Sequence, residues 1–198
     1  MARTRAADYV ERRAAIVEAA AQLYARDGFA GASVARLAEA LGASKSLIYH
    51  YYASKEDILF DVMDSHLRAL DEAAAHVMGR DLPAAEKLRE IARRFMRLYA
   101  GAAARHKVLL NGLGALPPAR RDEVVSRQRR LIEAVEGLLV EIQPKLARRP
   151  RARRPAAMLF FGMINWTHTW FHEGGPASAA DVANLAADIT LKGLAGLE

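Results

Sequence analysis

Residues 33–59, SVARLAEALGASKSLIYHYYASKEDIL, constrain the fold more than any other stretch because helix starts, a helix stop and apolar spacing coincide in them. Apolar side chains recur at helical spacing after Ser33, a residue type that caps helix N-termini. Gly42 follows, and glycine most readily takes the left-handed conformation that ends a helix. Ser44 then begins a second capped segment. The pattern predicts two short helices joined by a tight turn.

The second short helix places polar-tipped side chains between its buried positions. Leu47 and Ile48 supply its apolar side, and Ser54 begins an S-x-x-D capping box that opens a longer third helix. Two helices joined by a glycine-centred turn, with donors on the outer face of the second, make a helix-turn-helix, although structural bundles use the same shape. The donors in this helix are Lys45, Ser46, Tyr49, His50 and Tyr51.

The amino-acid sequence of this stretch resembles that of the DNA-binding domain of the TetR family of bacterial transcriptional regulators. The family pattern is T/S-V-x-x-I/L-A-x-x-A/L-G-V/A-S, followed by L/I-Y-x-H/Y-F/Y-x-S-K-E-x-L. Its positions are occupied here by Ser33-Val34, Leu37-Ala38, Leu41-Gly42-Ala43-Ser44, Ile48-Tyr49, Tyr51-Tyr52 and Ser54-Lys55-Glu56-Asp57-Ile58-Leu59. The resemblance covers residues 9–60 and continues only in helix number and length. Many members carry histidine where this chain has Tyr51, which keeps a donor and implies an altered phosphate contact.

The resemblance implies which residues meet DNA. Family members mostly contact backbone phosphates from the positions of Tyr49, Tyr51 and Lys55, and we assign base reading to the remaining donors of the second helix. So few base contacts per chain imply a homodimer on a palindromic operator. The predicted DNA-binding residues are Ser33, Arg36, Ser44, Lys45, Ser46, Tyr49, His50, Tyr51 and Lys55.

Helical periodicity continues through the rest of the chain, which predicts an all-α fold with about nine helices. The first helix is expected from about Asp8 to Asp27, after a disordered arm containing Arg3 and Arg5. Later helices are expected over 55–78, 84–104, 106–115, 119–143 and 156–172, with a last one starting at Ser178 or Asp181. We predict a helix-turn-helix DNA-binding domain at residues 1–53 and a ligand-binding, dimerising domain at 54–198.

The apolar residues of the middle helices are core by default, but the resemblance implies that the core is hollowed to bind a small hydrophobic effector. Residues 161–171, FGMINWTHTWF, resemble family members that respond to acyl-CoA thioesters, and the arginines of 148–154 could meet the phosphates of such a ligand, or simply face solvent. The predicted ligand-binding residues are Met63, Phe95, Leu98, Tyr99, Leu109, Leu113, Leu139, Phe161, Asn165 and Trp166. In the family the last two helices dimerise, which implies an interface containing Trp170, Val182, Leu185 and Ile189.

Composition restricts the class of protein without locating the site. The 198 residues include no cysteine, so disulfides and thiolate metal sites are excluded. No apolar run is long enough to span a membrane, and the N-terminus MARTRAADYVERR has no apolar core of a signal peptide, so we expect a cytoplasmic protein. Residues 145–154, expected to form a loop or a frayed helix end, carry six basic and no acidic side chains, which accounts for the net charge of +6.

No catalytic motif or phosphate-binding loop is present, so we expect neither an enzyme nor a cofactor. His168 and His172 are spaced to share a helical face next to Glu173, but no third metal ligand is identifiable and we expect no metal site. Two alternatives to the repressor stay open: an architectural DNA-binding protein without an effector, and an enzyme that uses the same apolar pocket.

Overall fold

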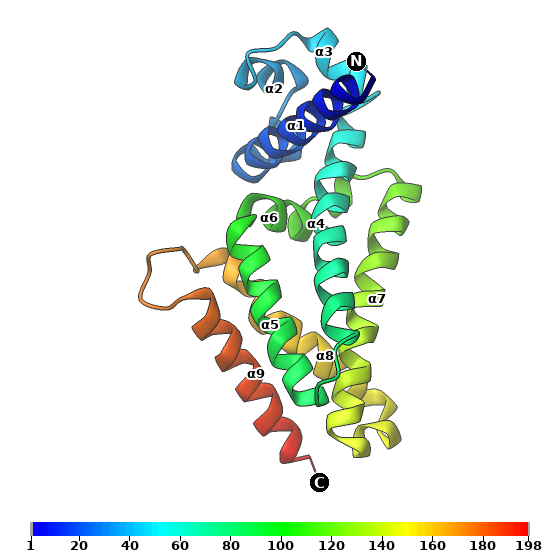
Figure 1. Cartoon of the computed structure of the whole chain (residues 1–198), viewed down its shortest axis with the longest axis vertical. Coiled ribbons are helices and arrows are strands. Elements are labelled where there is room, and N and C mark those ends of the chain that lie inside the picture. Colours follow the sequence, from blue (N-terminus) through cyan, green and yellow to red (C-terminus); the bar gives the residue numbers. More distant parts are fainter. Residues whose placement is uncertain (1, 198) are drawn as a thin grey trace. The chain divides into compact units, whose positions relative to one another are not determined.

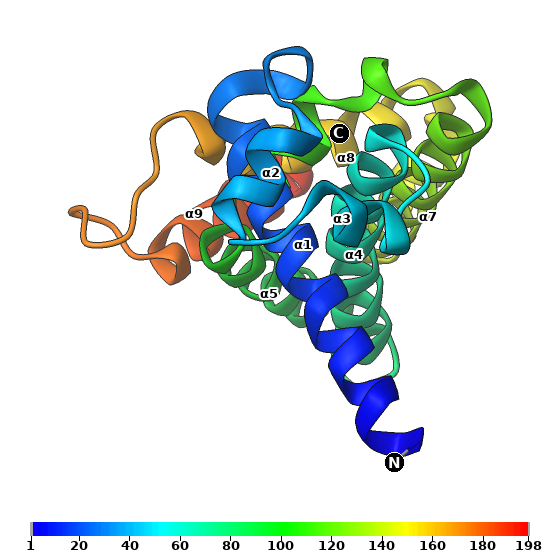
Figure 2. The ribbon, with the colours of Figure 1, turned by 90° about the horizontal axis from the view of Figure 1, so that it is seen from above.

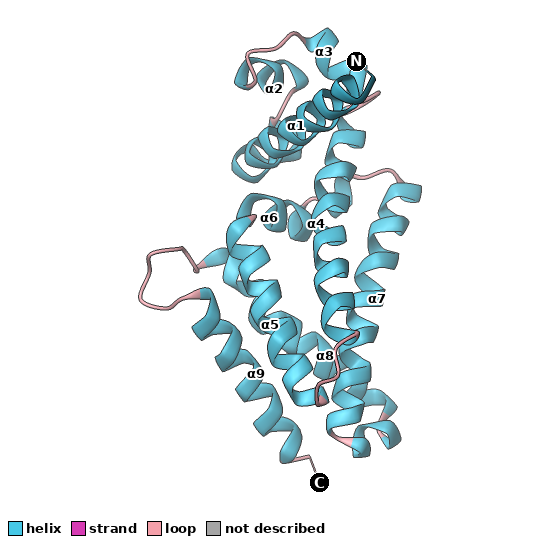
Figure 3. Cartoon of the chain, in the orientation of Figure 1, coloured by secondary structure: helices cyan, strands magenta, loops and turns pink. Residues whose placement is uncertain are grey.

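The computed structural model describes residues 2–197, with side chains from Asp8 onward. Nine α-helices and three short 3-10 helices make up the regular structure of this part of the chain, and no strand occurs in it (Figure 3). The all-helical fold predicted from the periodicity is confirmed.

The first helix, α1 (Ala2–Gly31), begins earlier than the predicted start near Asp8. Its first residues are mostly alanine and arginine, which are strong helix formers, so the expected disordered arm is helical instead. The side chains of Arg3 and Arg5 lie outside the described part of the structure. The backbone leaves the helical conformation at Gly28, where φ is 73°, so the predicted glycine stop is present as a break within α1.

The two helices of the helix-turn-helix form as their caps predict. The Ser33 hydroxyl accepts a hydrogen bond from the third backbone N–H after it, at 3.2 Å, and so starts α2 (Val34–Ala40). Ser44 does the same at 3.1 Å for α3 (Lys45–Tyr51). Gly42 lies between the helices with φ of 59°, a conformation that suits glycine.

The third helix of this region, α4 (Lys55–Met78), has the predicted bounds. The Ser54 hydroxyl accepts from the backbone N–H of Asp57 at 3.1 Å and donates to its carboxylate at 2.7 Å, as expected for a capped start. The remaining elements are α5 (Ala84–Gly101), α6 (Ala103–Asn111), η1 (Leu113–Ala115), α7 (Pro118–Ile142), η2 (Pro144–Arg148), α8 (Pro150–Asn165), η3 (Trp166–Thr169) and α9 (Ala179–Ala195).

The chain packs as two compact units. The first contains residues up to His66 together with Ala104–Val124, so most of α6, with η1, packs with the N-terminal helices (Figure 1). Arg105 of α6 forms a 2.6 Å ion pair with Glu18 of α1, and a Cβ added to Gly112 would lie 2.7 Å from the Met63 side chain of α4. These contacts hold the segment against the N-terminal helices, and the predicted boundary between residues 53 and 54 stays a prediction.

The second unit contains Leu67–Ala103 and the residues from Val125 onward. In it, α5 and α9 run side by side (Figure 1), and Arg93 donates a 2.8 Å hydrogen bond to Asn184 across them. Phe95, Met96 and Phe160 are among the largest fully buried side chains. Burial of these apolar side chains holds α5, α8 and α9 together.

Two sequence predictions in the second unit are wrong. The basic segment, predicted as a loop or a frayed helix end, is helical over most of its length. Pro144–Arg148 form η2, and α8 already starts at Pro150, where proline's fixed φ suits the first helical position. The helix expected to continue to residue 172 ends at Asn165, so His168 and His172 do not share a face of one α-helix. Their Nδ1 atoms lie 2.9 Å and 3.4 Å from backbone carbonyl oxygens.

Candidate nucleic-acid interface

Helix α3 has one buried apolar side chain that attaches it to the fold and several exposed side chains that can donate hydrogen bonds. Ile48 is fully buried and ties the helix to the first unit. Lys45, Ser46, Tyr49 and His50 are exposed, and Tyr49 has 54% of its surface accessible. Ammonium, hydroxyl and imidazole groups on one short helix can meet both phosphates and base edges. The exposed side chains of α3 therefore form a candidate surface for DNA.

Tyr51 differs from the other donors of α3 because it is half-buried against α1. Its ring centroid lies 4.7 Å from that of Tyr9, with 30° between the ring planes. The His50 ring contacts the Tyr51 ring edge-to-face, with 5.3 Å between the ring centroids. Figure 2 shows α3 beside α1 and the start of α4. Tyr51 thus contributes packing as well as a hydroxyl.

Next to it, Tyr52 and Asp61 form a buried polar contact. The Tyr52 hydroxyl donates to Oδ2 of Asp61 at 2.5 Å, and a guanidinium nitrogen of Arg13 lies 2.8 Å from the same oxygen. Burial, followed by the hydrogen bond and charge of Asp61, raises the pKa of Tyr52. Our sequence reasoning missed this contact. An aspartate between the apolar Ile58 and Val62 was the available signal, because a buried carboxylate needs partners.

Besides Ser44, whose hydroxyl caps α3, three other predicted DNA-binding side chains have partners within the first unit. The Ser33 hydroxyl caps α2. Arg36 lies 2.7 Å from the carboxylate of Asp27 and donates to the carbonyl of Gly31 at 3.2 Å. The Lys55 ammonium donates to the carbonyl of Phe29 and lies 4.0 Å from the centre of that ring. These contacts hold the three side chains in place, and their predicted contact with DNA stays a prediction.

The predicted ligand-binding residues are divided between the two units. Met63, Leu109 and Leu113 belong to the first unit, and the others belong to the second. Most are buried, Leu98, Leu113 and Asn165 are half-buried, and Trp166 is 65% exposed. In the second unit the rings of Tyr99 and Phe161 lie 6.1 Å and 6.3 Å from that of Phe95, and burial raises the pKa of Tyr99. The predicted residues of the second unit are Phe95, Leu98, Tyr99, Leu139, Phe161, Asn165 and Trp166.

The Asn165 amide combines burial with an unused acceptor. Its Oδ1 atom is buried and accepts no hydrogen bond from the described residues. Asn165 is the last residue of α8, one turn after Phe161. A buried acceptor without a donor is costly, so this atom is suited to a ligand that brings an N–H or O–H group.

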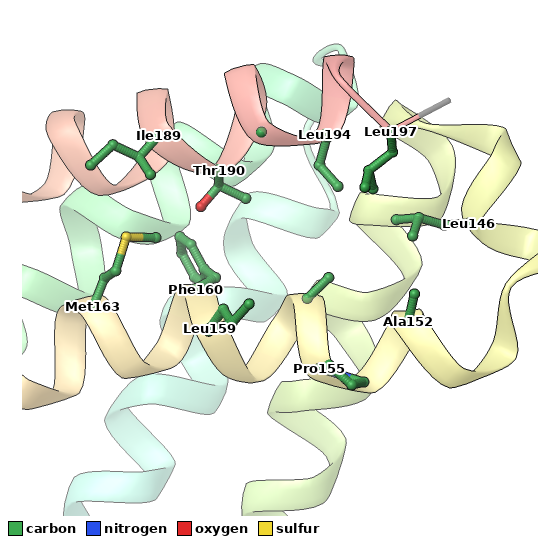
Figure 4. Close-up of a pocket in the computed structure, with 12 residues that line it drawn as sticks. Leu146, Ala152, Pro155, Leu159, Phe160, Met163, Ile189, Thr190, Leu194 and Leu197 are labelled. Atoms are coloured by element: carbon green, nitrogen blue, oxygen red, sulfur yellow. The ribbon is translucent and has the colours of Figure 1, made fainter.

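An apolar groove of about 490 Å³ lies between α8 and α9 (Figure 4). Figure 4 shows Leu159, Phe160 and Met163 of α8 opposite Ile189 and Thr190 of α9. Of the predicted site residues, only Ile189 lines it. The same two helices, with the residues that follow α8, also expose several large apolar side chains to solvent: Met158, Leu159, Trp166, Trp170, Leu185 and Ile189. Val182 is half-buried.

Metal-ligand groups and helices that could span a membrane are both absent from the described residues. No group of three or more potential metal ligands occurs among them. None of the helices they form is long and apolar enough to cross a membrane.

Comparison with known proteins relates both parts of the chain to one family. Residues 16–62 match the model of "Bacterial regulatory proteins, tetR family", and residues 81–194 match "Tetracyclin repressor-like, C-terminal domain". A TetR-family transcriptional regulator from Bordetella parapertussis is 36% identical, with a TM-score of 0.87, over 94% of this chain and 97% of that one.

Two further relatives match this chain over a shorter length or at lower sequence identity. The transcriptional repressor AcnR from Corynebacterium jeikeium is 37% identical over 68 residues, which are 34% of this chain and 36% of AcnR. The match therefore spans about a third of that relative's length. AibR, solved in complex with isovaleryl coenzyme A and operator DNA, is 24% identical with a TM-score of 0.80 over 90% of this chain and 97% of AibR. At that identity the likeness concerns the fold alone.

Proposed function

This chain belongs to the TetR family of bacterial regulatory proteins, and from that membership we propose that it is a transcriptional repressor that binds a palindromic operator as a homodimer and is released by a small hydrophobic effector. The observation that carries the proposal is α3, a capped helix with a buried anchor and an outer face of donors. We assign it no catalytic role.

On DNA, the roles follow from exposure and chemistry. Lys45, Ser46 and His50 are exposed near the start and along the outer face of α3, and we assign base reading to them. We assign exposed Tyr49 to a phosphate contact. Lys55 keeps two of its three N–H donors for a phosphate while the third holds Phe29. The remaining candidates, Ser33, Arg36, Ser44 and Tyr51, are assigned to positioning at the phosphate backbone.

A single copy of α3 reads too few bases for a unique genomic site, so the proposal requires two copies. The exposed apolar face of α8 and α9 supports a homodimer, because monomeric proteins rarely expose a large apolar surface to solvent. Trp170, Leu185 and Ile189 are each more than half exposed. With Val182 and the groove of Figure 4, they are proposed to pack against the same helices of a second copy.

For the effector we propose an acyl-CoA thioester, bound in the second unit. The aromatic cluster around Phe95 suits an acyl chain, and the unused Oδ1 of Asn165 suits an amide N–H of the pantetheine arm. Exposed Arg148, Arg151 and Arg153 are candidate partners for the phosphates. AibR, which shares this fold, binds isovaleryl coenzyme A.

Release requires that the effector bind the DNA-incompetent state better than the competent one. Shifting the population from 99:1 to 1:99 requires roughly 5.5 kcal/mol of differential affinity.

Selection of bound fragments from sheared genomic DNA by the purified protein at about 0.15 M salt, a near-physiological ionic strength, tests the proposed function. We expect a palindrome at a few promoters, and loss of the bound fragments when the acyl-CoA ligand is added. Broad recovery without a motif would favour the architectural alternative, and turnover of the thioester would favour the enzyme alternative.

A further inference from the structure

The orientation of α3 depends on its neighbours because the helix is very short. It contains seven residues, and isolated helices of this length are unstable in water. The Ser44 cap fixes its start, and buried Ile48 fixes its middle. The end of the helix, at Tyr51 and Tyr52, needs restraints of its own.

One restraint is the contact between Tyr9 and Tyr51. Tyr9 is 44% exposed, lies on α1, and has its ring 4.7 Å from that of Tyr51. A tilted pair at this spacing lies in the favourable range for aromatic contacts. The contact joins the outer end of α1 to the last turn of α3.

The second restraint is the chain of polar contacts from α1 through α4 to the end of α3. Asp61 of α4 is 5% exposed and receives both the Tyr52 hydroxyl at 2.5 Å and the Arg13 guanidinium at 2.8 Å. The Arg13 guanidinium also lies 5.9 Å from the centre of the Tyr52 ring. Removing either partner from a buried carboxylate is costly, because it leaves the charge without compensation. These contacts therefore resist a displacement of the end of α3.

We propose that Tyr9, Arg13, Tyr52 and Asp61, which we call the α3 clamp, position the recognition helix for reading the operator. The inference rests on the proposed function, and it assigns these four side chains no contact with bases. They act by keeping α3 in the orientation that brings its exposed donors to the groove.

Weakening the clamp should reduce operator specificity, which a general loss of folding stability would not do. If it is weakened, only a fraction of molecules holds α3 correctly, and the apparent Kd for the operator rises by the reciprocal of that fraction. Binding to non-specific DNA depends mainly on phosphate contacts and tolerates a mobile α3 better. The ratio of specific to non-specific affinity should therefore fall.

The test uses the full chain and the variants Tyr9→Ala, Tyr9→Phe and Tyr52→Phe. Backbone amide hydrogen exchange over residues 47–52 reports the order of α3 in the free protein. Affinity for the selected operator and for a scrambled duplex of equal length reports the specificity ratio. Arg105→Ala is the matched control, because it breaks an ion pair of the first unit away from α3.

We expect Tyr9→Ala and Tyr52→Phe to speed exchange in α3 and to lower the specificity ratio by about two- to tenfold, in line with one lost aromatic contact or hydrogen bond. Tyr9→Phe keeps the ring and should behave like the parent. Arg105→Ala should lower the melting temperature while exchange in α3 and the ratio stay unchanged.

The clamp is overturned if Tyr9→Ala and Tyr52→Phe leave both exchange in α3 and the specificity ratio at the parent values. It is also overturned if Arg105→Ala changes them equally. If the parent selects no operator, the proposed function fails, and hydrogen exchange in α3 alone still decides whether the clamp exists.

Discussion

Nε2 of His66 on α4 lies 3.3 Å from Nδ1 of His106 on α6, and both side chains are buried in the first unit. Burial, with a smaller contribution from the charge of Arg105, lowers the pKa of His66 to about 4. The pair joins two helices of the first unit, and burial favours the neutral form of His66.

This pair makes stability depend on pH. The pKa of His66 is depressed on folding, so between its ordinary value of about 6.5 and about 4 the unfolded chain binds more protons than the folded one. The free energy of unfolding should fall as the pH drops through this window, by about 3 kcal/mol at most for this residue. Urea unfolding at several pH values, compared with His66→Gln, measures the contribution. Equal pH profiles for parent and variant would remove His66 as its source.

Lys55→Ala should affect both folding and DNA binding. The ammonium holds the Phe29 carbonyl and ring, so the melting temperature should fall by a few degrees. If Lys55 also meets a phosphate, the slope of log affinity against log salt should become shallower by about one.

Tyr49→Ala serves as the comparison, because an uncharged side chain releases no counterion. It should weaken operator binding by about tenfold with an unchanged salt slope. An unchanged slope in Lys55→Ala would leave the lysine with a structural role only.

Charges on the exposed face of α9 should separate the proposed dimer. Leu185→Glu and Ile189→Glu place carboxylates at positions 61% and 52% exposed in the single chain, where they cost little stability unless a second copy covers them. The double variant should sediment as the 21.7 kDa chain and lose operator binding. Lys192→Glu, an exposed charge change on the same helix, should stay dimeric. A parent that sediments as a monomer at micromolar concentration would contradict the proposed interface.

Asn165→Leu tests the proposed effector site. Because Oδ1 is buried without a donor in the described structure, the substitution should leave the melting temperature unchanged or raise it. It should weaken binding of acyl-CoA thioesters by about tenfold, through loss of the acceptor for an amide N–H. Calorimetric titration with short-, medium- and long-chain thioesters measures the change. A variant that binds as tightly as the parent would remove Asn165 from the site.

The sequence predicted the features that are decided locally. Ser33 and Ser44 cap helices through bonds to residues three positions away, and Gly42 ends a helix by its own backbone conformation. A short window contains all the information for such features. The helix starts and the turn that carry the candidate interface could therefore be predicted residue by residue.

Contacts between distant residues could not be predicted in this way. The apolar neighbours of Asp61 indicate a buried carboxylate, but nothing identifies the Tyr52 hydroxyl as its partner, and nothing in α6 indicates that Arg105 pairs with Glu18. The basic segment was misjudged because its prolines suggest a loop, whereas Pro150 begins α8. The groove between α8 and α9 depends on how two helices pack, and periodicity gives only the faces they present.

Specific operator reading by α3 is tested most directly by the ratio of the parent's affinity for its selected palindrome to that for a scrambled duplex of equal length, at about 0.15 M salt. We expect a preference of about 10³-fold or more, with two chains bound per palindrome. Equal affinity for the two duplexes would contradict specific reading by α3 and leave non-specific DNA binding as the better description.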